Sequence, residues 1–423
     1  MPAVSNIIVF FHSPDYSPTM QRLQAFKYEL QPTGEQERTM RRFSGSCRFV
    51  FNKALALQQA NHESGNKFIS YVTMAKQLTE WRNGTETPWL KEAPCHALQH
   101  TLKDLEKAYK NFFQKRSCFP RFKRRGGGDS FRYPDPLQFK LDQANNRIFL
   151  PKLGWLRYRN SRDVVGELRN VTVSGNCGKW FISIQTQREV EQPVTTATAA
   201  AGIDVGITHF ATLNNGSHIA PLNSCKSHQK RLAKYQRRMS HKIKFSNNWK
   251  KAKKRVQKIH TRIANVRKDF LHKATTAISK NHALVCIEDL QVKNMSKSAA
   301  GTAEQPGKQV RQKAGLNRSI LDQGWGAFRQ QLDYKLRWAG GTLITVPPHN
   351  TSRTCPHCGH ISADNRKTQA QFNCVDCGYE NNADVVGAIN ILERGYRLLA
   401  CGEPVLSYSV KQEPTEVNQL VFS

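Results

Sequence analysis

The chain of 423 residues is long enough for two or three packed units with a substantial core. Lys and Arg number 64 against 32 Asp and Glu, which gives a formal net charge of +32. This charge favours a polyanionic partner, with nucleic acid first and an anionic membrane surface as the alternative. The sequence has no run of about 18 apolar residues and no lipidation motif, so we expect no membrane partner.

Two features at the level of the whole chain indicate the compartment. The apolar stretch IIVFF near the amino terminus has no Lys or Arg ahead of it, so a secretory signal is not expected. Eleven cysteines include one C-x2-C…C-x2-C array, a pattern typical of metal binding in a reducing compartment. We therefore expect a cytoplasmic protein. Residues 1–19 are expected to be a disordered extension, and either Met1 or Met20 can serve as the start.

The first folded region is predicted to be helical. In ALQHTLKDLEKAYKNFF (97–113) the apolar residues recur at three-four spacing, which forms one stripe along a helix. The segment GEQERTMRRFSGSCRFVFNKALALQQ has the same character, so we expect a helical lobe over residues 35–133. The lobe also contains two polar candidates for nucleic-acid contact, Tyr71 and Gln99, each of which has an equally good structural interpretation.

Short strand-like runs separated by turn residues follow, including RIFLPKLGWLRYR and the pair NVTVS and KWFISIQTQ. The strand QAFKYEL lies before the helical lobe and has no local partner, so we expect it to complete the same sheet. Residues 20–34 and 134–192 are thus predicted to form a small β-barrel-like module. The stretch PVTTATAAA then indicates a linker over residues 193–200.

The remaining chain predicts an α/β layer with a mixed sheet, because three strands in a meander precede alternating helices and strands. We assign residues 201–350 and 379–395 to this domain and expect residues 396–423 to be a flexible tail. Three acids stand out in this domain. Asp204 is expected in the middle of a strand of the first hairpin, Glu288 near the carboxyl end of a buried strand, and Asp384 where an apolar helix begins.

Each acid has an ordinary alternative interpretation. Asp384 could cap its helix, and Glu288 could be a solvated residue at a strand end. Asp204 is harder to explain in this way, because a carboxylate among apolar strand residues is costly to bury without a cation. If the three acids surround one cleft, they suit divalent cations of the Mg²⁺ type, and two such ions can activate a water and stabilise the leaving oxygen in hydrolysis of phosphodiesters.

The most specific motif is CPHCGHISADNRKTQAQFNCVDCG. It contains two C-x2-C pairs with a spacing suited to a closed tetrahedral zinc site of structural type. We therefore predict a zinc ribbon over residues 351–378, and disulfides or free thiols are the alternatives. The predicted zinc ligands are Cys355, Cys358, Cys374 and Cys377.

Two basic segments are candidates for nucleic-acid binding. Residues 226–280 carry 19 Lys or Arg against a single acid, on helices whose apolar residues keep one packed face. The stretch CFPRFKRRGGGDSFRY mixes cations with aromatic residues, which suits backbone contact and base stacking. A solvated charged surface is the alternative interpretation of both. The candidate contacts are Arg121, Lys123, Arg124, Arg237, Arg238, Lys251, Lys254 and Arg255.

These motifs occur together, and in the same order, in a known family. GSCRFVFNKAL, FPRFK, LPKLGWLRYR, GIDVGI, IEDLQVKNM, CPHCG, CVDCG and ADVVGAINI resemble the transposon-encoded TnpB (OrfB-type) RNA-guided endonucleases, which are related to type V CRISPR effectors. The resemblance extends from about residue 21 to residue 395. It implies a multidomain α+β protein in which the β-barrel module has a wedge-like role, the helical lobe a recognition role, and the α/β domain is RNase H-like (RuvC) with an inserted zinc ribbon.

The resemblance also implies a function and its partners. The catalytic acids would be Asp204, Glu288 and Asp384, with Mg²⁺ as cofactor and structural Zn²⁺ in the ribbon. The partners would be a guide RNA from the transposon end and double-stranded target DNA beside a short flanking motif, with the protein at the nucleoid of a prokaryote when bound to DNA. A cleavage-inactive guided repressor and an accessory transposase or recombination protein are the alternatives, and the oligomeric state stays open.

Overall fold

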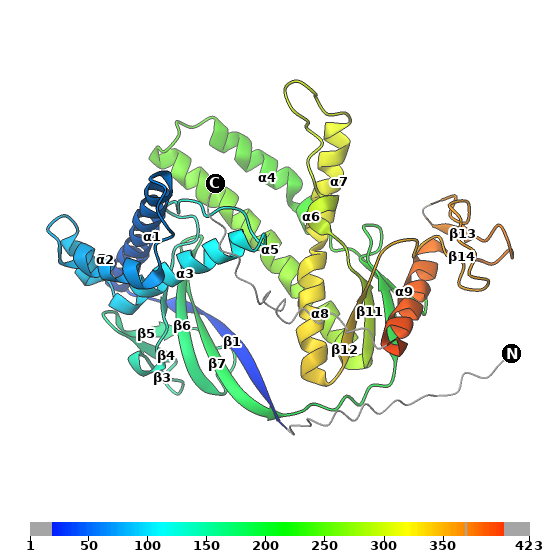
Figure 1. Cartoon of the computed structure of the whole chain (residues 1–423), viewed down its shortest axis with the longest axis horizontal. Coiled ribbons are helices and arrows are strands. Elements are labelled where there is room, and N and C mark those ends of the chain that lie inside the picture. Colours follow the sequence, from blue (N-terminus) through cyan, green and yellow to red (C-terminus); the bar gives the residue numbers. More distant parts are fainter. Residues whose placement is uncertain (1–18, 369, 402–423) are drawn as a thin grey trace. The chain divides into compact units, whose positions relative to one another are not determined.

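The computed structural model describes residues 19–368 and 370–401 and is shown in Figure 1. The chain divides into two compact units, the first ending at Glu191 and the second beginning at Gln192, next to the segment predicted as a linker. The predicted amino-terminal extension, apart from residue 19, and residues 402–423 of the predicted tail lie outside the described residues. Within the described ranges, no helix is both long and apolar enough to span a membrane.

Three helices build the helical part of the first unit. They are α1 (Gly34–Glu63), α2 (Tyr71–Asn83) and α3 (Cys95–Phe113). Helix α1 begins where the sequence supplies a capping box. The Thr33 side chain accepts a hydrogen bond from the Gln36 amide, and the Gln36 side chain accepts one from the Thr33 amide. Two amide groups that a helix start leaves unpaired are satisfied in this way.

The strands of the first unit form one seven-stranded antiparallel sheet in the order β2-β6-β7-β1-β5-β4-β3. They are β1 (Thr19–Gln31), β2 (Ser130–Tyr133), β3 (Lys140–Asp142), β4 (Arg147–Leu150), β5 (Gly154–Tyr158), β6 (Glu167–Asn176) and β7 (Lys179–Glu191). As the sequence predicted, β1 finds its partners far along the chain, pairing with β7 from Thr19 opposite Glu191 to Leu30 opposite Trp180.

Two details of this sheet differ from the prediction. The sheet is open between its edge strands β2 and β3, whereas the sequence indicated a barrel-like module. Strand β2 was assigned to the helical lobe, yet it pairs with β6, Phe131 lying opposite Val173. Four residues alternate too briefly to give a clear strand signal, so β2 could be recognised only through its partner.

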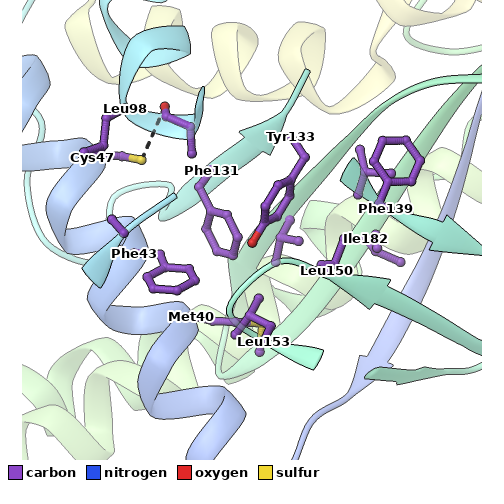
Figure 2. Packing of buried hydrophobic residues seen from close by; sticks show 14 of the residues in the cluster. Met40, Phe43, Cys47, Leu98, Phe131, Tyr133, Phe139, Leu150, Leu153 and Ile182 are labelled. Carbon is purple, nitrogen blue, oxygen red and sulfur yellow. Dashed lines mark hydrogen bonds between the residues drawn. The ribbon is translucent and has the colours of Figure 1, made fainter. Parts of the chain in front are cut away.

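One apolar core joins the helices and the sheet of this unit, and Figure 2 shows its packing. Phe43 of α1 packs edge to face against Phe131 of β2, with ring centroids 5.7 Å apart. Cys47 lies against α3 and donates a weak hydrogen bond to the Ala97 carbonyl. Tyr133 is fully buried and satisfies its hydroxyl by donating to the Pro151 carbonyl. The shared core explains why helices and strands form one compact unit.

The second unit contains a five-stranded mixed sheet in the order β10-β9-β8-β11-β12. Its strands are β8 (Ala200–Asp204), β9 (Ala211–Leu213), β10 (His218–Ile219), β11 (Leu284–Glu288) and β12 (Thr342–Val346). The first three form an antiparallel meander, whereas β11 is parallel to both β8 and β12. The meander followed by parallel strands confirms the predicted mixed sheet. Ala200, assigned to the linker, is the first residue of β8.

The helices of the second unit are α4 (Ser224–Ser240), α5 (Asn247–Asn281), α6 (Val292–Met295), α7 (Val310–Gln323), α8 (Trp325–Ala339) and α9 (Ala383–Ala400). Helix α9 extends to Ala400, so the predicted flexible tail does not begin at residue 396. The predicted ribbon also extends further. A two-stranded sheet of β13 (Gln371–Asn373) and β14 (Glu380–Asn382) leads directly into α9.

Helix α9 packs unusually close to β8. A Cβ atom added at Gly202 would lie 2.0 Å from the Ala388 carbonyl oxygen, far inside van der Waals contact. Only glycine fits there, which brings the start of α9 next to the end of the central strand. This close approach positions the residues described next.

Candidate functional site

The three acids predicted to share a cleft come from three different elements that meet at one edge of the mixed sheet. Asp204 is the last residue of β8 and Glu288 the last residue of β11, while Asp384 lies in the first turn of α9. Strands β8 and β11 are parallel neighbours with Ile203 opposite Ile287, so the two strand acids lie side by side. The sequence placed Asp204 in mid-strand, whereas in the structure it lies where β8 ends.

The electrostatics of Asp204 indicate how strongly the site concentrates negative charge. Burial, followed by the neighbouring carboxylates of Glu288 and Asp384, raises the pKa of Asp204 to about 8, against an opposing effect of Arg366. An acid with this pKa is held protonated at neutral pH because its environment supplies too little positive charge. A divalent cation would relieve this repulsion.

Glu288 is held by a hydrogen bond from the segment that enters the ribbon. The Thr351 hydroxyl donates to its Oε1 over 2.5 Å. Burial raises the pKa of Glu288, whereas the Thr351 hydrogen bond and the cations of Arg394 and Arg366 lower it. Thr351 is itself fixed by Asn390 of α9, whose side-chain amide donates to the Thr351 carbonyl over 2.7 Å. The alternative of a freely solvated strand-end acid is therefore wrong for Glu288.

Asp384 does not cap its helix. The cap of α9 is Asn382, whose side-chain oxygen accepts hydrogen bonds from the amides of Asp384 and Val385. The Asp384 carboxylate instead lies 3.5 Å from the Arg366 guanidinium and 3.8 Å from Nδ1 of His209. The capping interpretation of Asp384 is thus wrong, and its carboxylate points toward Arg366 and His209.

A second glycine allows α9 to approach the acids. A Cβ atom at Gly387 would lie 3.1 Å from Oδ2 of Asp204, a contact tighter than side chains normally make. Gly387 follows Asp384 by three residues, so both lie on the same face of the helix. The carboxylates of Asp204 on β8 and Asp384 on α9 thereby lie toward one another.

The donor set fits Mg²⁺ in its chemistry, because hard divalent cations prefer carboxylate oxygens and commonly keep several waters. The carboxylates are more widely spaced than a closed set of ligands. Within residues 19–368 and 370–401, the four cysteines alone form a group of three or more His, Cys, Asp or Glu side chains whose ligand atoms all lie within 4.8 Å. Asp204, Glu288 and Asp384 thus form an open cluster in which water can complete the coordination.

The four cysteines are arranged as two knuckles facing one another. Sγ of Cys355 lies 3.7 Å from Sγ of Cys377, and Sγ of Cys358 lies 3.6 Å from Sγ of Cys374. A tetrahedron with Zn–S bonds of about 2.3 Å has sulfur–sulfur edges of about 3.8 Å. Disulfide sulfurs lie at only about 2.05 Å, so these distances match zinc and not the disulfide alternative.

Backbone geometry explains why these sequences form knuckles. In the first, the Gly359 amide donates to the Cys355 carbonyl, and in the second the Gly378 amide donates to the Cys374 carbonyl. Both glycines have positive φ, 79° and 70°, which a C-x2-C-G turn requires. The amides of Cys377 and Asp376 donate toward the Cys374 thiol and lower its pKa, which favours the thiolate that binds zinc.

Several residues at the acid cluster have no signal of their own in the sequence. Arg366 lies in the ribbon between the two knuckles, where a single Arg resembles any surface cation. His209 lies in the turn between β8 and β9, and Thr351 and Asn390 are ordinary polar residues until folding places them at the site. Glycines flanked by apolar residues in an acid-containing helix, as in ADVVGAINI, are the one pattern that could have indicated close packing.

The basic candidates of the second unit lie on the pair of helices α4 and α5. Val256, Ile259 and Ile263 are buried along one face of α5, as the predicted packed face requires. The five predicted contacts lie on exposed positions of the two helices: Arg237, Arg238, Lys251, Lys254 and Arg255. Their positive charges are therefore available to a polyanion.

The candidates of the first unit, Arg121, Lys123 and Arg124, all lie at exposed positions but differ in their contacts. Lys123 is tied to α1, because its amide donates to the Asn52 side chain and its Nζ lies 4.0 Å from the centre of the Phe51 ring. Burial lowers the pKa of Lys123. Lys123 is thus at least partly structural.

The two polar candidates of the helical lobe are both half-buried. Tyr71 opens α2, where Nζ of Lys103 lies 5.1 Å from the centre of its ring. Gln99 lies on α3. Neither position by itself distinguishes a contact to nucleic acid from a structural role.

The fold and these two sites define a strongly basic α/β protein with a cluster of three acids and a four-cysteine ribbon. Comparison of sequences finds relatives that match nearly the whole chain. Over 401 residues the chain is 60% identical to "Putative RNA-guided DNA endonuclease InsQ" of Escherichia coli (strain K12), covering 95% of this chain and 99% of that protein. Over 411 residues it is 35% identical to a Streptomyces pristinaespiralis protein of the same descriptive name, covering 93% and 97%.

The chain therefore belongs to the OrfB family of IS605-type transposons, the TnpB-like family that the motifs resemble. Three family profiles match separate parts of it. One described as "Probable transposase" matches residues 183–299, and one described as "Cas12f1-like, TNB domain" matches residues 325–391. A third, described as "Helix-turn-helix domain", matches residues 20–67, which in this structure form strand β1 and the single long helix α1.

A solved structure supports the fold. The chain is similar to the protein in "Cryo-EM structure of the Cas12f1-sgRNA-target DNA complex", with a TM-score of 0.52 at 12% identity, covering 89% of this chain and 99% of that one. At this identity the similarity concerns the fold alone. It supports a mixed α/β fold similar to that of Cas12 effectors.

Proposed function

We propose that the protein is an RNA-guided DNA endonuclease of an insertion-sequence transposon. Its active site for hydrolysis of target DNA would consist of Asp204, Glu288 and Asp384. The observation that carries the proposal is that these three acids meet at one edge of the mixed sheet, although Asp204 and Asp384 are 180 residues apart along the chain. Relatives across nearly the whole chain are named as RNA-guided DNA endonucleases, which supports the same activity here. The domain would be RNase H-like (RuvC), as the three-strand meander followed by parallel strands supports.

In this proposal the three carboxylates would hold two Mg²⁺ ions, which when bound would supply charge neutralisation at the phosphate and activation of water. The protein's own part is to hold the carboxylates ionised and correctly spaced. The high pKa of Asp204 means that cation binding and loss of its proton are linked. Thr351 keeps Glu288 oriented and favours its ionised form.

Arg366 is proposed to act as a mobile counter-cation of the site. It lies 3.5 Å from Asp384 and lowers the pKa of both Asp204 and Glu288. When cations and a DNA phosphate enter, its guanidinium is well suited to move to the phosphate, since arginine binds phosphate oxygens in bidentate fashion. The ribbon would then have two tasks, to hold zinc and to present Arg366.

The proposed partners are a guide RNA derived from the transposon end and a double-stranded DNA target, in the cytoplasm and at the nucleoid of a prokaryotic cell. The net charge of +32 and the exposed cations of α4 and α5 support polyanionic partners. The helical lobe would read the motif that flanks the target, with Tyr71 and Gln99 as its candidate contacts. Sequence choice would come from pairing between RNA and DNA.

The test compares Asp204→Asn with a matched acid outside the cluster. Asp269 of α5 is exposed and pairs only with Lys273 one turn away, so Asp269→Asn is the control. Both variants and the intact protein are purified from cells that co-express the neighbouring transposon-end DNA, and the RNA that co-purifies is sequenced. Cleavage of a matched duplex is then measured with and without Mg²⁺.

We expect the intact protein and Asp269→Asn to cleave, and Asp204→Asn to lose about 10³-fold or more in rate while its affinity for the matched duplex changes little. Retained cleavage in Asp204→Asn would refute the assignment of the site. RNA binding without cleavage by the intact protein would favour a guided repressor. Absence of bound RNA would favour a role in recombination.

A further inference from the structure

The turn that joins α4 to α5 carries exposed apolar side chains at the tip of a long helical hairpin, visible in Figure 1 as the connection between the two green helices. Ile243 is 84% exposed and Phe245 is 66% exposed. Neither belongs to a hydrophobic core cluster of the described residues. Two large apolar side chains held in water at the end of a hairpin require an explanation.

The backbone at the tip is strained at Phe245, whose aromatic ring is exposed. Phe245 has a φ of 70°, in the left-handed region where aromatic residues are rare. The turn is closed by a hydrogen bond from the Ser246 amide to the Ile243 carbonyl. Asn or Gly would adopt this conformation at a lower conformational free energy. Phe at this position therefore makes the fold less stable, which indicates that its ring has another role.

The ring is accompanied by another aromatic residue and by lysines. Trp249 in the first turn of α5 lies edge to face against Phe245, with ring centroids 5.5 Å apart. Nζ of Lys244 lies 5.3 Å from the centre of the Phe245 ring, and Nζ of Lys253 lies 5.1 Å from that of Trp249. An aromatic platform next to ammonium groups is the combination that binds a base and its phosphate.

Below the tip, the groove between the two helices forms a cationic cleft of ≈ 420 Å³. Tyr235 lies within it, and no carboxylate lines it. The other lining residues are His228, Arg231, Arg255, Lys258, Ile259 and Arg262. Residues 226–268 as a whole carry 17 Lys or Arg and no Asp or Glu. The cleft is therefore suited to the phosphates of a strand that passes toward the tip.

We propose that the tip of the α4–α5 hairpin binds an unpaired base of the RNA, with Phe245 stacking on the base and the cationic cleft holding the phosphates that follow. This inference rests on the proposed function and adds a stacking site to it. RNA is favoured because residues 226–268 of the hairpin contain no acids to offset the repulsion among their 17 cations, so a resident polyanion would stabilise the hairpin continuously. Unpaired RNA bases are commonly bound on aromatic side chains.

The first test uses the strain at Phe245. Phe245→Asn relieves the left-handed backbone and removes the ring, so we expect a higher midpoint of thermal unfolding for the RNA-free protein together with an RNA affinity weaker by about 5- to 150-fold. Phe245→Trp should retain the affinity. Leu137→Ala, which removes a 91% exposed apolar side chain of the first unit, is the control and should change neither value. An Asn variant that loses stability, or that binds RNA as well as the intact protein, would overturn the proposal.

The second test separates stacking from charge by the salt dependence of RNA affinity. Phe245→Ala should weaken binding without changing the slope of log Kd against log salt concentration. Arg255→Ala, in the cleft, should reduce that slope by about 0.7 for the one phosphate contact it loses. A change of slope in Phe245→Ala would overturn the stacking role.

Two further outcomes identify other occupants. The RNA-free protein is mixed with vesicles of anionic phosphatidylglycerol, and sedimentation that depends on Phe245 with unchanged RNA affinity would assign the tip to a membrane surface and overturn the proposal. If Phe245→Ala impairs binding of target duplex but not of RNA, the tip contacts DNA and the proposal also fails. Failure of the intact protein to bind any RNA refutes the proposed function itself, so the two failures are distinguishable.

Discussion

The Thr351 hydroxyl and the Glu288 carboxylate are joined by a hydrogen bond of 2.5 Å, although the two residues are 63 positions apart. Glu288 ends a strand of the central sheet, and Thr351 begins the segment that leads into the first knuckle of the ribbon. The bond thus couples an acid of the candidate active site to the four-cysteine ribbon.

Removing this bond is expected to impair cleavage without unfolding the protein. Thr351→Val keeps the shape of the side chain but loses the donor, and a hydrogen bond to a charged group is worth about 1.5–3 kcal/mol, or about 10- to 150-fold in rate. Because Thr351 lowers the pKa of Glu288, its loss raises that pKa further. The acid limb of the pH–rate profile should therefore move to higher pH.

The matched control is Thr354→Val, since the Thr354 hydroxyl donates only to the Asn350 carbonyl. Rates and pH profiles are measured on the same duplex for both variants. Equal rates in the two variants would show that the bond to Glu288 does not matter for catalysis.

A methyl group at Gly387 should disturb the acids specifically. The added Cβ of Gly387→Ala would lie 3.1 Å from Oδ2 of Asp204, so the carboxylate must shift by a few tenths of an ångström. Displacements of this size reduce catalysis, and we expect a loss of about 10- to 100-fold with little change in unfolding temperature. Gly315→Ala in α7 meets no neighbour and should stabilise its helix by up to about 1 kcal/mol. Unchanged cleavage by Gly387→Ala would contradict the close approach.

The stability of the cation-free protein should depend on pH through Asp204. The pKa of this acid is about 8 in the fold against 3.8 for an ordinary Asp, so between these values the folded state binds more protons than the unfolded state. The free energy of unfolding should therefore fall as pH rises from about 4 to 8, by at most about 1.4 kcal/mol per pH unit.

The measurement is urea unfolding from pH 5 to pH 8 in Mg²⁺-free buffer without chelator, so that the ribbon keeps its zinc, for the intact protein and for Asp204→Asn. The other titrating groups are common to both proteins, so the difference reports Asp204. The intact protein should lose stability relative to the variant as pH rises and regain it on addition of Mg²⁺. Parallel curves would show that Asp204 titrates normally.

Loss of zinc should affect both folding and cleavage. Cys374 is buried in the ribbon, and Cys374→Ser should abolish stoichiometric zinc and unfold the ribbon, because structural zinc binding is coupled to folding. Cleavage should fall with it, since Thr351 and Arg366 belong to the same segment. Cys118 is exposed in the first unit, so Cys118→Ser should keep zinc, stability and cleavage. Full zinc content in Cys374→Ser by metal analysis would refute the predicted ligand set.

The sequence predicted those parts of the fold whose signals are local. Helices with a clear apolar stripe, such as α3 and α5, and the knuckles of Cys355 and Cys374 follow from periodicity and spacing. The long-range partner of β1 was predicted because a strand needs one. Strand β2 was not, since four residues carry too little pattern to separate a strand from a loop.

The residues of the candidate site also differ in whether a local sequence pattern could predict them. Asp204 stood out because a carboxylate in an apolar strand is unusual, but Arg366, Thr351 and Asn390 act through contacts across tens of residues that no local pattern encodes. The hypothesis that Asp384 caps α9 was reasonable from position alone. It failed because Asn382, two residues earlier, provides a better cap.

The position of α9 in the sequence has a consequence for synthesis. Asp384 and the glycine face that completes the acid cluster leave the ribosome more than a hundred residues after the basic helices α4 and α5. A nascent or truncated chain can therefore gather nucleic acid on its basic helices while its third carboxylate is still missing. The order of the elements thus places the basic surface ahead of the complete acid cluster during synthesis.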